Sequence, residues 1–293
     1  MSKKLCVLIN TRDRPTECAL LLQSLRTQTF QDFDVFILDD MSGAHMSNYH
    51  FFNCMITRIK SENHRIFMKR TEFPHGVSRA RHAISEWAFD SGDYAYALRV
   101  DDDVILEPDY IERLFKVIDA GYDIASGVTV AMQNPVFIRD PKFLNGIINR
   151  VILDDKGNYI MNGDDCGCGY TDSVILPAHH FRSCAIITKE VHAKVKYYPT
   201  VLSKHGFREE QIFSYKALMA GFTIGVDTCA VNYHQLTPSG GERFPDQIDL
   251  TKFNQGQFRD FTRKHKAALN KIFTHDNMPD KLEFMKECNL LME

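Results

Sequence analysis

The 293-residue sequence lacks several features that would place it in a specialised class of protein. It contains no apolar run close to the roughly 18 residues that a membrane-spanning helix requires. Its first residues include two lysines, but neither a long apolar core nor the small-residue cleavage site of a signal peptide follows. We therefore expect a soluble, cytosolic protein whose eight cysteines stay reduced.

The sequence also lacks an excess of charge and a paired-cysteine motif. Its 35 basic and 38 acidic side chains give a net charge of −3, which provides no global signal for nucleic acid or anionic membrane. None of the cysteines forms a CxxC pair. A zinc site is disfavoured because the spacing matches no known structural zinc site, and the residues concerned are Cys166, Cys168, His179, His180 and Cys184.

Apolar strand patterns and helical patterns alternate four times in roughly the first 120 residues, which indicates an α/β fold with a largely parallel sheet. The expected strands are Lys4–Asn10, Phe33–Leu38, Arg65–Lys69 and Tyr94–Val100. The expected helices are one capped by Thr16, then Asn48–Ile59, Val77–Phe89 and Asp109–Ile118.

The second half of the sequence is less regular. Gln133–Tyr170 is rich in Asn, Asp and Gly and predicts hairpins and long loops. One amphipathic helix is expected at Phe207–Met219, and the chain from Asp249 onward is polar with a helical pattern. The expected strands are Asp123–Ala131, Phe181–Thr188, Phe222–Asp227 and Cys229–Tyr233.

Three consecutive carboxylates, Asp101, Asp102 and Asp103, follow the strand Tyr94–Val100. Like charges repel one another unless a cation or hydrogen-bond donors lie among them. Oxygen ligands of this kind suit Mg²⁺ or Mn²⁺, although a solvated acidic turn is the simpler interpretation of composition alone. Ligands of parallel α/β sheets bind at the carboxyl ends of strands. The other polar residues expected at that edge are Thr11, Arg14, Asp39 and Asp40.

Several other candidates have a simple structural interpretation. Glu209 and Glu210 lie in the first turn of a predicted helix, where acids complement the helix dipole. His234 follows a strand, and a lone histidine there is more often structural. The basic residues near the C-terminus are best explained as a solvated helix face, although a nucleic-acid site stays open, and they are Arg259, Arg263, Lys264, His265, Lys266 and Lys271.

Taken in order, six segments resemble those of family 2 glycosyltransferases with the GT-A fold. They are VLINTRDRP, SLRTQTFQDFDVFILDDMS, HGVSRARHAI, ALRVDDDVILEPDYI, FREEQIFSYKALMAGFTIGVD and VNYHQ, and they span roughly Leu5 to Gln235. Met41 replaces the family's usual glycine, His82 its asparagine and Glu210 its aspartate. The last difference leaves open whether Glu209 or Glu210 is catalytic.

The resemblance implies a Rossmann-like, mostly parallel sheet flanked by helices, with a smaller mixed-sheet acceptor half and a helical C-terminal segment. The expected GT-A domain is 1–240, divided into a nucleotide-sugar-binding half, 1–103, and an acceptor half, 104–240. Residues 241–293 are expected to form a flexible loop and a helical extension.

The resemblance also implies a metal-dependent transferase that moves a sugar from a nucleotide-diphosphate sugar, with uridine the expected base, to an acceptor hydroxyl with inversion. Asp101, Asp103 and His234 would hold Mn²⁺ or Mg²⁺ on the diphosphate, and Glu210 or Glu209 would be the base. The glycine-bearing loop Thr237–Arg243 would close over the diphosphate. The expected nucleotide-sugar contacts are Thr11, Arg14, Asp39, Asp40, Arg81, Asp101, Asp102 and Arg243.

Two alternatives remain at this point. A nucleotidyltransferase would use a similar sheet and metal, but it normally carries a glycine-rich loop after the first strand, whereas this sequence has TRDRP. A nucleotide-sugar-binding protein without catalysis would have lost its carboxylates, which are all present here. The acceptor is expected to be a glycan, a lipid-linked sugar or another hydroxyl compound, and a nucleic acid is only weakly supported.

Overall fold

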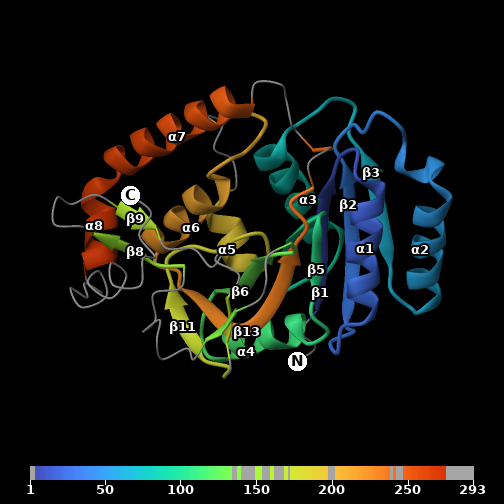
Figure 1. Cartoon of the computed structure of the whole chain (residues 1–293), viewed down its shortest axis with the longest axis horizontal. Coiled ribbons are helices and arrows are strands. Elements are labelled where there is room, and N and C mark those ends of the chain that lie inside the picture. Colours follow the sequence, from blue (N-terminus) through green and yellow to red (C-terminus); the bar gives the residue numbers. More distant parts are fainter. Residues whose placement is uncertain are drawn as a thin grey trace.

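The computed structural model describes residues 4–133, 137–139, 149–153, 159–161, 168–170, 172–196, 202–237, 240–241 and 247–274. Within this part, one nine-stranded mixed sheet runs through the molecule with helices on both faces (Figure 1). Its strand order is β11-β13-β6-β12-β4-β1-β2-β3, and β5 pairs with β13.

The N-terminal part of the sheet is parallel, as the alternation of strands and helices predicts. Apolar residues cover both faces of β1, so that Leu5, Val7 and Ile9 pack toward α1 and α2, whereas Cys6 and Leu8 pack toward α3. The strands are β1 (Leu5–Thr11), β2 (Phe33–Asp39), β3 (Ile66–Arg70) and β4 (Tyr96–Asp101). The helices are α1 (Pro15–Arg26), η1 (Met46–Asn48), α2 (His50–Ser61) and α3 (Val77–Ser91).

The start of α1 differs from the prediction. The helix begins at Pro15, Arg14 occupies the N-cap position, and no side chain caps the helix end, so the expected cap by Thr16 is wrong. Proline suits the first helical position because its φ is already helical and its missing N–H would have no partner there. As a result, Arg14 lies at the carboxyl end of β1, where its side chain reaches the end of β4.

The second half of the chain continues the same sheet with antiparallel pairs. Strand β12 pairs with both β4 and β6, and β6 runs parallel to β13. The strands predicted at Phe222–Asp227 and Cys229–Tyr233 are one strand, because a register irregularity between Val226 and Val231 interrupts the pairing without ending it. These strands are β5 (Val104–Leu106), β6 (Ile124–Ala131), β11 (Ile175–Ala178), β12 (Ala185–Thr188) and β13 (Ile224–His234).

Helices α4, α5 and α6 cover this second part of the sheet. The apolar positions of α4 recur at helical spacing, and they pack with α1 on one face. Helices α5 and α6 cover the opposite face through Val191, Phe213 and Ala217. The bounds are α4 (Tyr110–Asp119), α5 (Lys189–Lys194) and α6 (Glu209–Met219).

The C-terminal helices pack on the outer side of α6 (Figure 1). Phe258 of α7 and Phe273 of α8 meet Ile212 and Tyr215 of α6 in a separate apolar cluster. Helix α6 is therefore fixed on two sides, by the sheet and by this extension. The remaining elements are α7 (Gln247–Lys264), α8 (Lys266–Thr274), the pair β8 (Val151–Leu153) and β9 (Tyr159–Met161), and the pair β7 (Phe137–Arg139) and β10 (Cys168–Tyr170).

These elements confirm the predicted α/β fold, with a parallel N-terminal sheet, a mixed second part and helices on both faces. The mixed part is continuous with the parallel part, because β12 joins β4 to β6. Among the described residues, no helix has both the length and the apolar character needed to cross a membrane. The division at residues 103 and 240 stays a prediction.

Candidate active site

A cleft opens at the carboxyl ends of β1 and β4, and its cavity measures about 230 Å³. The β1–α1 connection and the start of α3 form one wall, and the segment before α6 forms another. The residues that line it include Arg14, Arg81, Asp101, Asp103, Glu210 and His234. The structure thus brings residues from five separate sequence segments to one edge of the sheet, as the resemblance implies.

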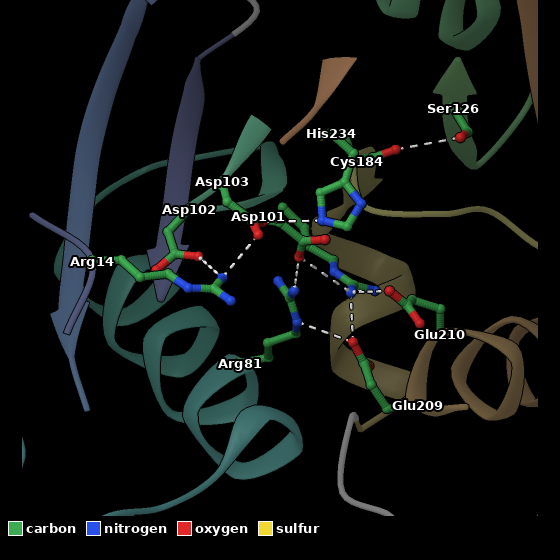
Figure 2. Close-up of polar contacts among 11 residues, drawn as sticks. Arg14, Arg81, Asp101, Asp102, Asp103, Ser126, Cys184, Glu209, Glu210 and His234 are labelled. Carbon is green, nitrogen blue, oxygen red and sulfur yellow. Dashed lines mark hydrogen bonds and ion pairs between the residues drawn. The ribbon is translucent and has the colours of Figure 1, made fainter. Parts of the chain in front are cut away.

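The aspartate group, Asp101, Asp102 and Asp103, lies at the end of β4, where the chain turns into β5. Strand β5 pairs with the end of β13, and this pairing places His234 beside Asp103, with 3.1 Å between His234 Nε2 and Asp103 Oδ1. One ligand atom each from Asp101, Asp103 and His234 lies within 4.8 Å of the others (Figure 2). Two carboxylates and an imidazole at this spacing fit Mn²⁺ or Mg²⁺.

Asp102 turns toward Arg14 instead. Arg14 Nη1 lies 2.9 Å from Asp102 Oδ1 and 3.0 Å from Asp103 Oδ2, and all three side chains are buried. Burial raises the pKa of Asp102 to about 6, although the Arg14 charge opposes this shift. Burial would also raise the pKa of Asp103, but the hydrogen bond and charge of His234 together with Arg14 lower it below its usual value. Asp103 is therefore the more firmly ionised of the two.

The glutamate pair, Glu209 and Glu210, begins α6 on the other side of the cleft. Glu209 is 2% exposed, and its Oε1 contacts Arg99 Nη2 at 2.5 Å and Arg81 Nε at 3.0 Å. Burial raises the pKa of Glu209 to about 7 against the opposing charges of Arg99 and Arg81. The Glu210 side chain is 23% exposed and lines the cleft, and its Oε1 lies 3.0 Å from Arg99 Nη2. The two glutamates thus have different environments.

Asp39 and Asp40 also differ from one another. Asp40 accepts hydrogen bonds from the backbone N–H groups of His75 and Gly76 and from the Thr71 hydroxyl, so it holds the connection into α3. Asp39 accepts one bond from the Ser42 N–H, and its buried Oδ2 has no hydrogen-bond partner among the described residues. Thr11 lies beside them and is buried in the cleft wall.

The chain after β13 crosses over the β1–α1 connection. The Gln235 N–H donates to the Asp103 carbonyl, and the Gly241 N–H donates to the Arg12 carbonyl, both at 2.8 Å. Gly240 has φ +75°, and a Cβ at this position would lie 2.5 Å from Arg14 Cγ. This segment therefore covers Arg14 closely. The predicted contact Arg243 lies outside the described residues, as does Cys166 of the disfavoured zinc site.

Sequence reasoning missed Arg99, which occupies the centre of the site. The available signal was a single charged residue inside the otherwise apolar strand Tyr94–Val100, two positions before Asp101. Alternation along a strand places Arg99 and Asp101 on the same face. His205 and Phe207 also line the cleft and were missed, because His205 lies in a segment without a readable pattern and Phe207 was expected inside a helix that in fact begins at Glu209.

Comparison with solved structures shows the same fold at low sequence identity. The crystal structure of GalNAc-T7 with UDP, GalNAc and Mn²⁺ matches with a TM-score of 0.60 and 12% identity over 92% of this chain. The Staphylococcus aureus TarS 1–349 structure in complex with UDP-GlcNAc matches with a TM-score of 0.53 and 14% identity over 84% of this chain. The matches cover 58% and 64% of those two chains, respectively.

A search of curated proteins gives no match. The model of the family described as "Glycosyl transferase family 2" matches residues 6–175, which is more than half of the chain. The matched range contains the β1–α1 connection, α3 and the aspartate group. The chain therefore belongs to glycosyl transferase family 2, a family of glycosyltransferase enzymes.

Proposed function

We propose that the chain is a metal-dependent, inverting glycosyltransferase that moves a sugar from a UDP-sugar to an acceptor hydroxyl. The observation that carries this proposal is the placement of Asp101, Asp103 and His234 opposite Glu210 across one cleft. The GalNAc-T7 structure with UDP and Mn²⁺ and the TarS structure with UDP-GlcNAc support the choice of donor and cation.

On the donor side, Asp101, Asp103 and His234 would hold Mn²⁺ or Mg²⁺ against the diphosphate. The cation, when bound, would stabilise the negative charge that develops on the leaving diphosphate. Thr11 lines the cleft and is proposed to contact the uracil of the donor, whereas Asp39 is fully buried and keeps its proposed nucleotide contact on the family resemblance alone. Asp40 contributes by fixing the start of α3, which carries Arg81 toward Asp101.

On the acceptor side, Glu210 is the general base and Glu209 is a supporting residue. Glu210 reaches the cleft, whereas Glu209 is buried against two arginines. The acceptor oxygen forms a bond to the anomeric carbon while its proton passes to Glu210, and the bond between that carbon and the diphosphate oxygen breaks. Attack from the side opposite the leaving group inverts the anomeric centre.

The acceptor remains a hydroxyl compound of unspecified class, with a glycan or lipid-linked sugar proposed from the family. A nucleic-acid acceptor has less support. Arg259, Arg263 and Lys264 of α7 are exposed and could contact phosphates, but Arg263 already pairs with Asp260 on the same helix. A cytosolic location is likewise proposed and rests on the sequence alone.

The first experiment measures UDP release from a panel of UDP-sugars without acceptor, with Mn²⁺ or with a chelator. A slow release that requires the metal and falls in Asp103→Asn is expected of a transferase, because water replaces the acceptor. A stereochemical analysis of the released sugar then tests inversion. Tight UDP-sugar binding without any UDP release would instead indicate a binding protein. UDP release at the same rate with Mn²⁺ and with a chelator would contradict the proposed donor site.

A further inference from the structure

Arg99 contacts both glutamates, although the proposed reaction gives it no role. We propose that Arg99 is a positioning residue that fixes the Glu210 carboxylate against the donor side of the cleft. This inference rests on the proposed function, because it presumes that Glu210 is the base.

The surroundings of Arg99 hold its side chain in one place. Leu98 and Val100 pack in the core on the α1 face of the sheet, whereas Ala97 packs toward α3 on the opposite face. Alternation along β4 therefore directs Arg99 toward α3 and α6. Arg99 is 2% exposed, and its guanidinium lies over the Phe181 ring, 5.2 Å from the ring centre. Such a group has little freedom to move.

One nitrogen of Arg99 connects the two glutamates. Arg99 Nη2 lies 2.5 Å from Glu209 Oε1 and 3.0 Å from Glu210 Oε1. The contact with Arg99 is made through Oε1, and the Glu210 side chain is 23% exposed and lines the cleft, so its carboxylate can meet an acceptor hydroxyl. A glutamate side chain on a helix otherwise samples several rotamers, so the contact with Arg99 selects one of them.

The same contacts connect Glu210 to the donor side. Glu209 Oε1 lies 3.0 Å from Arg81 Nε, and Arg81 Nη2 contacts Asp101. The charges alternate in sign from Glu210 through Arg99, Glu209 and Arg81 to Asp101, so each contact is attractive. The base and the proposed metal ligands thus belong to one rigid ion-pair network. Displacement at the anomeric carbon requires a base whose position is fixed relative to the donor sugar.

The test compares Arg99→Met/Glu209→Gln with the wild type. The double substitution removes one positive and one negative charge, so it avoids an uncompensated buried charge. We expect kcat to fall about 10- to 100-fold, because displacing a catalytic base by about 1 Å reduces the rate by up to this factor. The donor KM and the affinity for UDP with Mn²⁺ are expected to change less than kcat, since Asp103 keeps its contact with His234 and Asp101 keeps its ion pair with Arg81.

Two further variants serve as controls. Arg26→Met removes an arginine that pairs with Glu62 between α1 and α2, away from the cleft, and should leave kcat unchanged. Arg99→Lys keeps the charge but loses the guanidinium, and we expect a smaller loss of kcat at constant donor KM. If the double variant does not fold, Arg99→Lys decides alone, because an unchanged kcat in it would overturn the proposal.

The outcomes separate the inference from the proposed function. An inactive Glu210→Gln together with a double variant of wild-type kcat would reject the role of Arg99 and retain Glu210 as base. A Glu210→Gln enzyme with wild-type kcat would reject the proposed base itself. A double variant whose UDP affinity falls as much as its kcat would show a general structural role, and it would also overturn the positioning proposal.

Discussion

The cleft contains two groups of neighbouring acidic residues, and the side chains that surround the two groups differ. The aspartate group faces His234, Arg14 and, through Asp101, Arg81, and it brings three ligand atoms close together. The glutamate pair faces two arginines, Arg81 and Arg99, which contact it directly. Arg81 is shared by both groups, so the difference lies in the ligand atoms. The aspartates and His234 gather three of them within reach of one cation, whereas the glutamates are engaged by arginines. The imidazole and the clustering of ligand atoms, rather than the acids alone, distinguish the proposed metal site from the proposed base.

The largest expected effect comes from the aspartate group. Asp103→Asn keeps the size of the side chain but removes the ionised oxygens that face His234 and Arg14. We expect kcat/KM to fall about 1,000-fold, which corresponds to about 4 kcal/mol of lost transition-state stabilisation. Initial rates with a saturating acceptor measure this loss. Asp109→Asn, at the start of α4, is the control, and an equal loss there would deny the aspartate group a special role.

The glutamate pair gives the next effect and tests whether its two members differ. Glu210→Gln cannot accept a proton, and we expect kcat to fall about 100-fold at nearly constant donor KM. Glu209→Gln keeps a hydrogen-bond acceptor for Arg81 and Arg99, so its kcat should fall much less. Steady-state kinetics of the two variants side by side provide the measurement. A larger loss in Glu209→Gln would reverse the assignment of the base.

The stability of the protein should also depend on Glu209. Its pKa rises to about 7 in the folded protein from a usual value of 4.5, because the carboxyl is buried. Between these pH values the folded state binds more protons than the unfolded state, so stability falls as pH rises from about 4.5 to about 7. We expect Glu209→Gln to flatten this decline by up to about 3 kcal/mol. Urea unfolding at several pH values measures it, and parallel pH profiles for the variant and wild type would contradict it.

The smallest effect concerns the segment that covers Arg14. Gly240→Ala strains a backbone with φ +75° and brings a methyl group onto Arg14, so we expect the donor KM to rise about fivefold. Gly121→Ala introduces similar strain at φ +97° but meets no atom within 4 Å. It should therefore cost stability without changing KM. Equal donor KM values for the two variants would show that the segment around Gly240 does not contribute to donor binding.

The sequence predicts most of the fold and only part of the site's organisation. Apolar strands such as Lys4–Asn10 and amphipathic helices such as Asp109–Ile118 carry their periodicity locally, so their order reveals an α/β sheet. The cap of α1 was misassigned because Pro15 starts the helix one residue before Thr16. The continuity of β13 was missed because its irregularity resembles a break between two strands.

The organisation of the site depends on pairs that are distant in sequence. Glu209 and Glu210 are adjacent and chemically alike, and only the positions of Arg81 and Arg99 in space separate them. Asp40 has the appearance of a ligand contact, yet three hydrogen bonds from Thr71, His75 and Gly76 engage it. Local sequence patterns were therefore enough to locate the acidic residues, whereas their different contacts could be seen only in the tertiary structure.

The most direct measurement is calorimetric titration of the protein with UDP, GDP and CDP, with and without Mn²⁺, repeated on Asp103→Asn. We predict that UDP binds most tightly, that its binding requires Mn²⁺, and that the substitution weakens it about 100-fold, equal to roughly 3 kcal/mol. UDP binding of equal strength without metal, or in Asp103→Asn, would contradict the assignment of Asp101, Asp103 and His234 as the metal site.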